Sequence, residues 1–533
     1  MQPESRRTFL KQASIAGAAF AAGRRLNGLA AESSPARVYI DPAQKIAPLD
    51  RKVFGSFIEH LGRSVYGGIY EPGSKLADAS GFRKDVLDEI KEMGVPIIRY
   101  PGGNFVSGYN WLDGVGPKDK RPVVLDKAWN TLEPNQFGTN EFMAWCKAVG
   151  TEPLMGLNLG TGTAEMAAAL VEYCNLGKGT KWSDLRRQHG IEQPHNVKYW
   201  CLGNEMDGPW QIGHMPAREY GLKARDSANQ MRMVDPSLQL IACGSSGPGM
   251  ATYLEWDRQV LEECYDMVDG ISLHCYYRND AMETGAAGDT SKFLSFNLQM
   301  EEQIEEIIGV CDYVRRRKRS RKQLWLSFDE WNVWYRARGG DGGGKLAPHL
   351  LEEVYNLEDA VLVGGFLNSL MRHAGRVRVA CLAQLINVIA PITTNPDGFF
   401  RHTIYYPYLW ALRCARGEVL DLAVESAAYE VKGAGQVPYI DVAGTQDRDR
   451  GTLSLFIMNR DLEKARDVEV VWREAPPQRV IFSQVLTGSD LKAFNSFENP
   501  NRVAPQPFDA PKPAPRMTLQ VPARSYTVIQ WGQ

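Results

Sequence analysis

Short apolar segments alternate with longer amphipathic segments along most of the chain, and this alternation constrains the fold more than any other feature. Amphipathic segments such as 82–93 and 217–234 have the periodicity of helices, and Gly94 follows the first of them as a stop signal. The apolar segments have the length of buried strands, and we place them at 53–58, 95–100, 152–159, 197–202, 238–243, 270–274, 324–328 and 377–382. Eight strand–helix alternations predict an α/β fold whose parallel strands close into a (β/α)8 TIM barrel.

The pattern changes near residue 412, where short strand-like segments replace the helices. These segments lie at 452–458, 468–472, 480–486, 517–521 and 526–531, with a proline-rich connection at 499–515. They predict an appended all-β sandwich of the jelly-roll type. An early strand-like segment at 37–40 has no place in the barrel. We therefore expect a barrel over residues 48–412 and a sandwich made of residues 36–47 together with 413–533.

The first 31 residues have the layout of an export signal. Arg6 and Arg7 are followed by Phe-Leu-Lys, and an apolar stretch at 13–22 ends before Arg24. Paired arginines in this setting are typical of twin-arginine signals. The apolar stretch is too short for a membrane helix, which needs about 20 residues. We therefore expect a twin-arginine signal peptide over 1–31, export to the periplasm or the cell exterior, and no membrane span.

Polar side chains follow the predicted strands, at the end of the barrel where enzymes of this fold place their active sites. Glu205 comes after the apolar run 199–202, and Glu330 comes after the run 324–328; tryptophans flank both. The other strand ends carry further hydrogen-bonding groups, namely Glu59, Asn104, Asn158, Ser246, His274, Tyr276 and Gln384. Groups of this kind, converging at one end of a barrel, are the expected lining of a sugar pocket.

Two glutamates at the same end of a barrel suit the hydrolysis of a glycosidic bond. This reaction needs two carboxyl groups that flank the scissile bond. One carboxyl must stay protonated near neutral pH, which requires that burial or a like charge raise its pKa, and the other must be ionised. A single glutamate in such a position is more often a surface residue in a salt bridge than a catalytic group. Together, Glu205 and Glu330 predict a sugar hydrolase.

Composition and charge argue against several other classes of protein. A formal net charge of −2 provides no basis for binding nucleic acid or an anionic membrane. The basic run at 315–322 ends a predicted helix, where positive charge offsets the helix dipole. The histidines form no H-E-x-x-H motif and the cysteines form no C-x-x-C pair, so we expect no metal and no cofactor.

Five long motifs give the chain a specific resemblance. They are FGSFIEHLG at 54–62, RYPGGNFVSGYNW at 99–111, WCLGNEMDGPWQIGH at 200–214, SFDEWNVWY at 327–335 and CLAQLINVIA at 381–390. With them the chain resembles glycoside hydrolase family 51, the intracellular-type α-L-arabinofuranosidases, over nearly all of its length after the signal. The resemblance implies a retaining, exo-acting α-L-arabinofuranosidase that hydrolyses terminal non-reducing α-L-arabinofuranosides in arabinoxylan or arabinan oligosaccharides.

The resemblance also implies roles for the two glutamates and their neighbours. Glu205 would be the acid/base and Glu330 the nucleophile, with the two carboxyl groups about 5–5.5 Å apart, as in retaining enzymes. Asn204 would bind the 2-hydroxyl of the sugar, and Tyr276 would orient Glu330. His274 would support both carboxylates without itself contacting the sugar.

Further consequences of the resemblance concern the pocket wall and the assembly. Glu59, Asn104 and Gln384 would hold the remaining hydroxyls of the furanose ring. Relatives form hexamers, so a homo-oligomer is expected. Cys275 stands where the family often has Gln, which puts the leaving-group preference in doubt. A glycine-rich loop at 339–344 follows Glu330 and either borders the leaving-group side or is a plain connection.

Two alternatives remain open at this point. An endoglucanase or a β-xylosidase would use the same fold and the same two carboxylates, because neither feature fixes the sugar. A non-catalytic sugar-binding protein would be expected to lack one of the two carboxylates, and both are present here.

Overall fold

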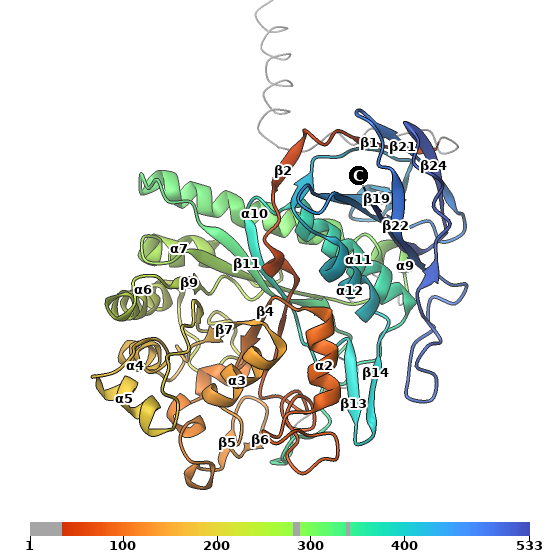
Figure 1. The fold of residues 1–533 in the computed structure, drawn as a ribbon. Helices are drawn as coiled ribbons and strands as arrows, with labels where there is room; N and C mark the ends of the chain where they lie inside the picture. Colours follow the sequence, from red (N-terminus) through yellow and green to blue (C-terminus); the bar gives the residue numbers. More distant parts are fainter. Residues whose placement is uncertain (1–34, 281–287, 337–341, 533) are drawn as a thin grey trace, which may run out of the picture.

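Eight parallel strands close into a barrel in which spatial neighbours are also successive barrel strands along the chain (Figure 1). The computed structural model describes residues 35–280, 288–336 and 342–532. The barrel strands are β3 (Gly55–Phe57), β4 (Ile97–Tyr100), β7 (Glu152–Gly156), β8 (Tyr199–Leu202), β9 (Gln239–Ala242), β10 (Gly270–Tyr277), β11 (Trp325–Val333) and β12 (Val377–Leu382). The predicted (β/α)8 TIM barrel is therefore confirmed.

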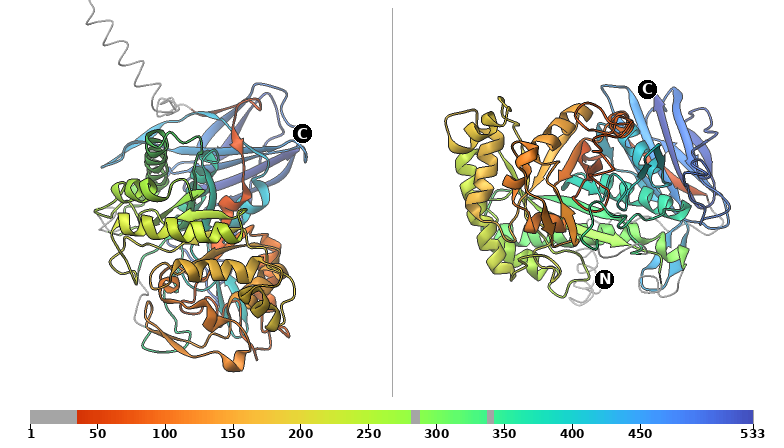
Figure 2. Two further views of the ribbon diagram at one scale, coloured as in Figure 1. Left: turned by 90° about the vertical axis from the view of Figure 1, so that its left-hand side faces the viewer. Right: turned by 90° about the horizontal axis from the view of Figure 1, so that it is seen from below.

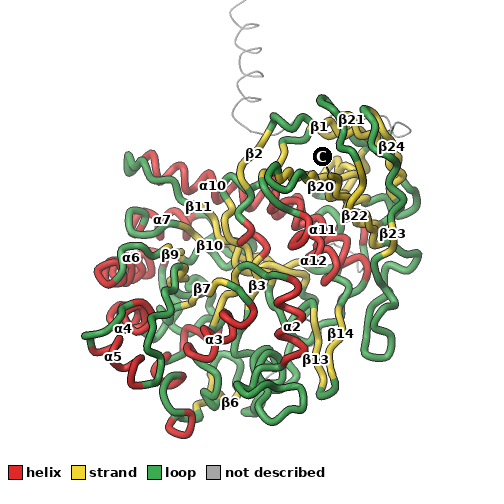
Figure 3. The backbone as a smooth tube through the Cα atoms, viewed as in Figure 1, coloured by secondary structure: helices red, strands yellow, loops and turns green. Residues whose placement is uncertain are grey.

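Helices surround the barrel strands, as the tube drawing shows (Figure 3). Two of them end at a glycine with a left-handed backbone: Gly94, with a φ of 70°, ends α2, and Gly150, with a φ of 80°, ends α3. The helices are α2 (Lys84–Met93), α3 (Thr139–Val149), α4 (Ala164–Asn175), α5 (Lys181–Gln188), α6 (Ala217–Val234), α7 (Glu255–Cys264), α9 (Thr290–Phe293), α10 (Phe296–Arg317), α11 (Leu357–Arg372) and α12 (Tyr405–Cys414).

Two barrel strands are longer than predicted, and both carry residues of the predicted site. We expected strands to end at His274 and at Phe328, but β10 continues to Tyr277 and β11 to Val333. The polar residues that follow, such as Asp329 and Glu330, do not end the strand because their side chains find hydrogen-bond partners inside the barrel. The basic run at 315–322 begins in the last turn of α10, as predicted.

The strands of two further sheets form an all-β sandwich at one side of the barrel, as predicted (Figures 1 and 2). Its larger sheet contains β2 (Lys45–Pro48), β15 (Glu418–Leu420), β19 (Ile440–Asp447), β20 (Thr452–Asn459), β25 (Ser525–Gly532), β22 (Arg479–Leu486) and β23 (Gln506–Pro507). Its smaller sheet contains β16 (Ala423–Glu425), β1 (Ala36–Ile40), β21 (Arg466–Trp472) and β24 (Arg516–Val521). Side chains of both sheets, including Val38, Val470, Leu455 and Ile529, form one buried core.

Three two-stranded ribbons lie outside the barrel and the sandwich sheets. They are β5 (Val124–Asp126) with β6 (Thr131–Glu133), β13 (Ile392–Asn395) with β14 (Gly398–Arg401), and β17 (Ala428–Val431) with β18 (Gly435–Pro438). In the described parts of the chain, no helix has the length and apolar character that crossing a bilayer requires.

A buried carboxylate joins the sandwich to the barrel helices. Asp441 of β19 accepts hydrogen bonds from Asn368 and Arg372 of α11, at 2.8 and 3.0 Å, and from Arg460 at 3.1 Å. Burial disfavours its charge, but the two arginines outweigh burial and hold the pKa of Asp441 below its ordinary value. The junction thus depends on an ionised carboxylate that two cations share.

Replacing Asp441 by Ala is expected to lower the free energy of unfolding by about 3 kcal/mol, because the buried Arg460 and the half-buried Arg372 lose their shared carboxylate. Thermal and denaturant unfolding measure the change. The control, Asp509→Ala, removes an exposed carboxylate of the same domain and should change stability by less than about 0.5 kcal/mol. Equal stabilities for the two variants would contradict the proposed role of Asp441.

Candidate active site

A cleft of about 600 Å³ opens at the carboxyl ends of the barrel strands. Residues that lie in or just after seven of the barrel strands line it: Glu59, Asn104, Glu205, Ser246, Tyr276, Glu330 and Gln384 among them. Tryptophans complete the wall, namely Trp129, Trp210 and Trp334. Aromatic faces beside hydrogen-bonding groups fit a sugar, which has apolar faces and a rim of hydroxyls.

Glu330 is held by a donor on each of its carboxylate oxygens. Arg99 Nη1 donates to Oε1 at 2.6 Å, and the Tyr276 hydroxyl donates to Oε2 at 2.8 Å. Glu330 and Arg99 are both buried. Burial disfavours the guanidinium charge, but Asp329 and Glu330 outweigh burial and raise the pKa of Arg99. A permanent cation therefore lies against a fixed carboxylate, which is the arrangement that a carboxylate nucleophile needs.

Glu205 has a different environment. It follows β8, on a backbone whose φ of 42° lies in the left-handed region. Its Oε1 lies 3.0 Å from His274 Nδ1, and its Oε2 accepts a 2.7 Å hydrogen bond from Trp210 Nε1. Burial, together with the negative charge of Glu330, raises the pKa of Glu205, while His274 opposes the increase. A raised pKa is what a carboxyl that donates a proton near neutral pH requires.

The two carboxylates lie close together. Oxygen atoms of Glu205 and Glu330 and a nitrogen of His274 all lie within 4.8 Å of one another. Three such side chains could in principle hold a cation. Both nitrogens of His274 and both oxygens of Glu330 already have partners, however, so the donor set fits proton transfer better than metal binding.

His274 lies among three carboxylates. Its Nε2 lies 3.0 Å from Asp329 Oδ1, and its Nδ1 lies 3.8 Å from Glu330 Oε2. Burial disfavours the cation, but the surrounding carboxylates outweigh burial and raise the pKa of His274 to about 10. Burial also disfavours the charge of Asp329, but Arg99 and His274 lower the pKa of that carboxyl. The imidazolium thus lies between the two glutamates and Asp329.

Glu59 closes another wall of the cleft. Its Oε1 accepts from the backbone N–H of Phe105 at 2.9 Å and from Trp129 Nε1 at 3.0 Å, and its Oε2 accepts from Gln384 Nε2 at 3.2 Å. Burial raises the pKa of Glu59 to about 8. A carboxylic acid that stays protonated at neutral pH can both donate to and accept from a sugar hydroxyl.

Asn204 lies beside these groups and is almost completely buried. Its Oδ1 accepts a 2.6 Å hydrogen bond from Arg99 Nη2, and its Nδ2 lies 3.5 Å from Asn104 Oδ1. Arg99 therefore fixes Glu330 and Asn204 at the same time. Every residue for which the resemblance implied a role is brought together here; the individual roles remain predictions.

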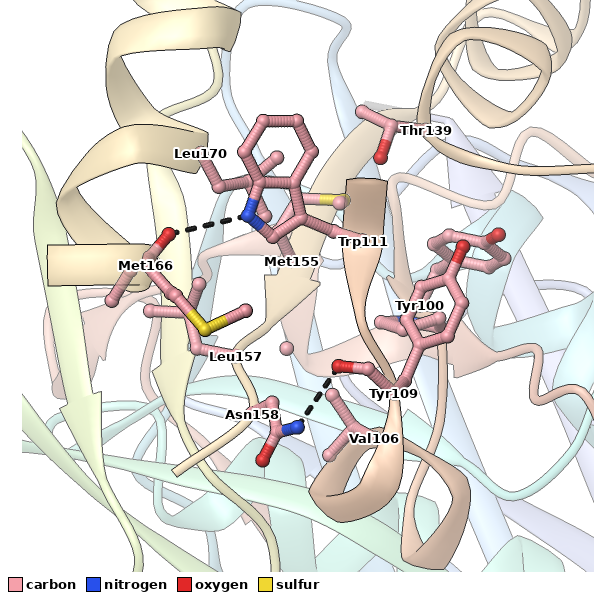
Figure 4. A pocket seen from close by; sticks show the side chains of 13 residues that line it. Tyr100, Val106, Tyr109, Trp111, Thr139, Met155, Leu157, Asn158, Met166 and Leu170 are labelled. Carbon is pink, nitrogen blue, oxygen red and sulfur yellow. Dashed lines mark hydrogen bonds between the residues drawn. The ribbon is translucent and has the colours of Figure 1, made fainter. Parts of the chain in front are cut away.

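One strand-end residue does not join the cleft. Asn158 follows β7, but its side chain donates to the Tyr109 carbonyl at 2.9 Å and lines a separate cavity of about 20 Å³ with Trp111 and Met166 (Figure 4). That cavity is large enough for about one water molecule. Among the described residues that line it there is no carboxylate.

The sequence did not predict some residues of the site. Arg99 and Asp329 lie inside apolar strands. Their charges could have indicated a functional role, because charged residues are seldom fully buried unless they are paired. Trp129 lies in the β5–β6 ribbon, which the strand–helix alternation did not predict. Cys275 lines the cleft, as its position beside Tyr276 indicated. Part of the glycine-rich loop, residues 339–341, lies outside the described residues.

Comparison with known proteins identifies the family. The α-L-arabinofuranosidase 1 domain matches residues 89–292, and the α-L-arabinofuranosidase C-terminal domain matches residues 329–525. An intracellular exo-α-(1→5)-L-arabinofuranosidase of Bacillus subtilis is 48% identical over 88% of this chain and 93% of its own length. An enzyme of the same name from Acetivibrio thermocellus is 46% identical over 89% of this chain and 94% of its own length. The solved structure of a family 51 α-L-arabinofuranosidase from Bifidobacterium longum matches with a TM-score of 0.89 at 39% identity, over 94% of this chain and 100% of that one.

These relatives overturn the predicted signal peptide and export. Both sequence relatives are named intracellular, and so are two others, from Halalkalibacterium halodurans and Streptomyces lividans. The predicted twin-arginine signal at 1–31 falls outside the described residues. The prediction of periplasmic or extracellular export was wrong, because it rested on an arginine pair and a short apolar stretch, a pattern with little information.

The fold, the paired carboxylates and these matches agree over nearly the whole described chain. The chain belongs to glycoside hydrolase family 51, the α-L-arabinofuranosidases, and it is a glycoside hydrolase.

Proposed function

We propose that the protein is a retaining, exo-acting enzyme that removes terminal α-L-arabinofuranosyl residues from arabinan or arabinoxylan oligosaccharides by double displacement. One observation carries the mechanism: the carboxylates of Glu205 and Glu330 come within 4.8 Å of each other, in contrasting environments. This spacing matches the shorter separation of retaining enzymes, because inverting enzymes need about 6.5–9.5 Å to admit a water molecule. The exo-α-(1→5) activity in the names of two relatives supports the substrate class.

In the first step the glycosidic bond breaks and a covalent bond to the enzyme forms. Glu330 attacks the anomeric carbon with the electron pair of one carboxylate oxygen. Glu205 gives its proton to the leaving oxygen, so that the aglycone departs as a neutral alcohol. Glu205 becomes an anion beside the cationic His274, which stabilises the new charge.

In the second step water replaces the enzyme on the sugar. The Glu205 carboxylate removes a proton from water, and the resulting oxygen attacks the anomeric carbon. The bond to Glu330 breaks and its electron pair returns to the carboxylate, whose negative charge the hydrogen bonds donated by Arg99 and Tyr276 stabilise. Two inversions give net retention, and both glutamates return to their starting states.

The remaining residues would hold the sugar. Asn204, which Arg99 keeps in place, would bind the 2-hydroxyl, a contact that strengthens in the transition states of such enzymes. Glu59, Asn104 and Gln384 would bind the other hydroxyls. By the resemblance to its family we also expect a homo-oligomer, a hexamer, which light scattering on the purified protein tests.

Replacing Glu205 by Gln is expected to lower the hydrolysis of an arabinan oligosaccharide by about 10²–10⁴-fold, because the leaving oxygen loses its proton donor. With an aryl arabinofuranoside whose leaving group needs no proton, added azide should restore turnover and give an arabinosyl azide of retained configuration, because Glu330 still forms the intermediate. The same azide should not rescue Glu330→Gln. Wild-type rates in either variant, or an inverted azide product, would contradict the assignment.

The pH dependence should reveal the influence of His274 on Glu205. Activity requires protonated Glu205, so kcat/KM should fall as pH rises through the raised pKa of that group. The cationic His274 favours ionised Glu205, so His274→Gln should raise that pKa further and move the alkaline limb of the profile to higher pH. A pH–rate profile of the variant measures the shift, and an alkaline limb that moved to lower pH would refute the arrangement.

A substrate panel distinguishes the proposed activity from the endoglucanase and β-xylosidase alternatives. Release of free arabinose from α-(1→5)-arabino-oligosaccharides and arabinoxylan oligosaccharides should exceed sugar release from cello- and xylo-oligosaccharides by at least about 10²-fold, since a site that hydrogen-bonds its sugar rejects analogues that leave its polar groups unpaired. Chromatography of the products measures each rate. Faster cleavage of cello-oligosaccharides would replace the proposal with the endoglucanase alternative, and binding of arabino-oligosaccharides without any release of sugar would indicate a binding protein.

A further inference from the structure

The β5–β6 ribbon carries one wall of the cleft. Its turn contains Trp129, which lines the cleft and donates its indole N–H to Glu59 Oε1 at 3.0 Å. Asp126 shapes this turn by accepting from the backbone N–H groups of Ala128, at 2.9 Å, and Trp129, at 3.1 Å. The position of the turn therefore decides whether Glu59 keeps one of its hydrogen-bond donors.

A segment from another part of the barrel holds this turn in place. Residues 342–345, which we call the strap, belong to the loop after β11, the strand that carries Glu330. Gly342 N donates to the Trp129 carbonyl at 3.1 Å, and Gly344 N donates to the Asn130 carbonyl at 2.8 Å. In return, Leu132 N donates to the Lys345 carbonyl at 3.0 Å. Three backbone hydrogen bonds thus attach the strap to the ribbon.

Gly342 allows the two backbones to approach this closely. A Cβ atom on Gly342 would lie 2.3 Å from Thr131 Cγ2, 2.6 Å from the Trp129 oxygen and 2.7 Å from the Asn130 oxygen. These distances are shorter than van der Waals contact, and two of the three atoms are backbone atoms, so the turn would have to move. The close approach at this position requires glycine.

The loop that contains the strap also lines the cleft, with residues that come before the strap and residues that come after it. Trp334 and Arg336 line the cleft before the strap, and Leu351 lines it afterwards. The Leu351 carbonyl accepts from Ile389 N at 2.8 Å, which fixes the far side of the loop beside another residue of the cleft. The loop therefore connects the strand that carries Glu330 with the wall that carries Trp129.

We propose that the strap is a positioning element for the substrate pocket: it holds Trp129 against Glu59 and so sets the affinity for the terminal sugar. Gly342 is its positioning residue and acts through Trp129, without touching the substrate itself. The inference rests on the proposed function, because turnover of an arabinofuranoside is one of its readouts.

The first test is Gly342→Ala, assayed with an aryl arabinofuranoside. KM should rise about tenfold while kcat changes by less than about threefold, because the wall that carries Trp129 would bind the ground state and the transition state of the sugar equally well. The control is Gly309→Ala, an exposed position of α10 where a Cβ meets nothing within 4 Å, and both of its constants should remain unchanged. A decrease confined to kcat, or unchanged constants in Gly342→Ala, would overturn the proposal.

A double-mutant cycle tests whether the strap acts through Trp129. Trp129→Phe keeps an aromatic ring but removes the indole donor to Glu59. If the strap acts by placing that donor, the double variant with Gly342→Ala should raise KM no more than the larger of the two single changes. Changes in KM that multiply would overturn the proposed route.

Hydrogen exchange provides a test that needs no variant. In the wild-type protein, the amides of Gly342, Gly344 and Leu132 should be protected, and added L-arabinose should slow exchange further in peptides that cover the strap and the ribbon. Slower exchange in the ribbon without any change in the strap would overturn the proposal. A wild-type enzyme that fails to hydrolyse arabinofuranosides would instead refute the proposed function, since the exchange result does not depend on turnover.

Discussion

The site depends above all on a buried cation, the guanidinium of Arg99. Two neighbouring carboxylates, Asp329 and Glu330, lie in the middle of β11, and both are buried. Without a compensating charge, this pair would repel and would cost several kcal/mol to keep out of water. Arg99 lies 2.6 Å from Glu330 and 3.8 Å from Asp329, and it also holds Asn204. One side chain from β4 thus allows β11 to carry Glu330, the proposed nucleophile, and at the same time fixes a residue that would contact the substrate.

The second cation, His274, makes the two glutamates different from each other. It lies at hydrogen-bond distance from Glu205 and Asp329 but 3.8 Å from Glu330, whose own oxygens are taken by Arg99 and Tyr276. Glu205 therefore keeps a raised pKa that a nearby cation moderates, whereas Glu330 is fixed by a permanent charge. Contrasting environments, rather than contrasting residue types, separate the two proposed chemical roles.

The sequence was sufficient for the barrel, the sandwich and the pair Glu205 and Glu330, because apolar periodicity and polar strand ends are local signals. It was insufficient where the decisive contacts are long-range. The extensions of β10 and β11 depend on partners for polar side chains that only the closed barrel supplies. The β5–β6 ribbon, which carries Trp129, is short and interrupts the alternation of strands and helices. Its own residues therefore did not predict the contact between Trp129 and Glu59. The prediction of an export signal was wrong for another reason, because the sequence pattern on which it rested is too short to be specific.

The backbone of Glu205, with its φ of 42°, has a consequence beyond catalysis. A residue with a side chain in this region costs the folded state roughly 1–3 kcal/mol, and glycine or asparagine relieves most of that cost. The stability of the folded protein and the proposed proton transfer by Glu205 thus favour different residues at this position. Substitution of Glu205 by glycine would relieve this backbone strain, but it would also remove the proposed proton donor and a hydrogen-bonded carboxylate of the buried His274. The strain is therefore tied to the side chain that its neighbours require at this position.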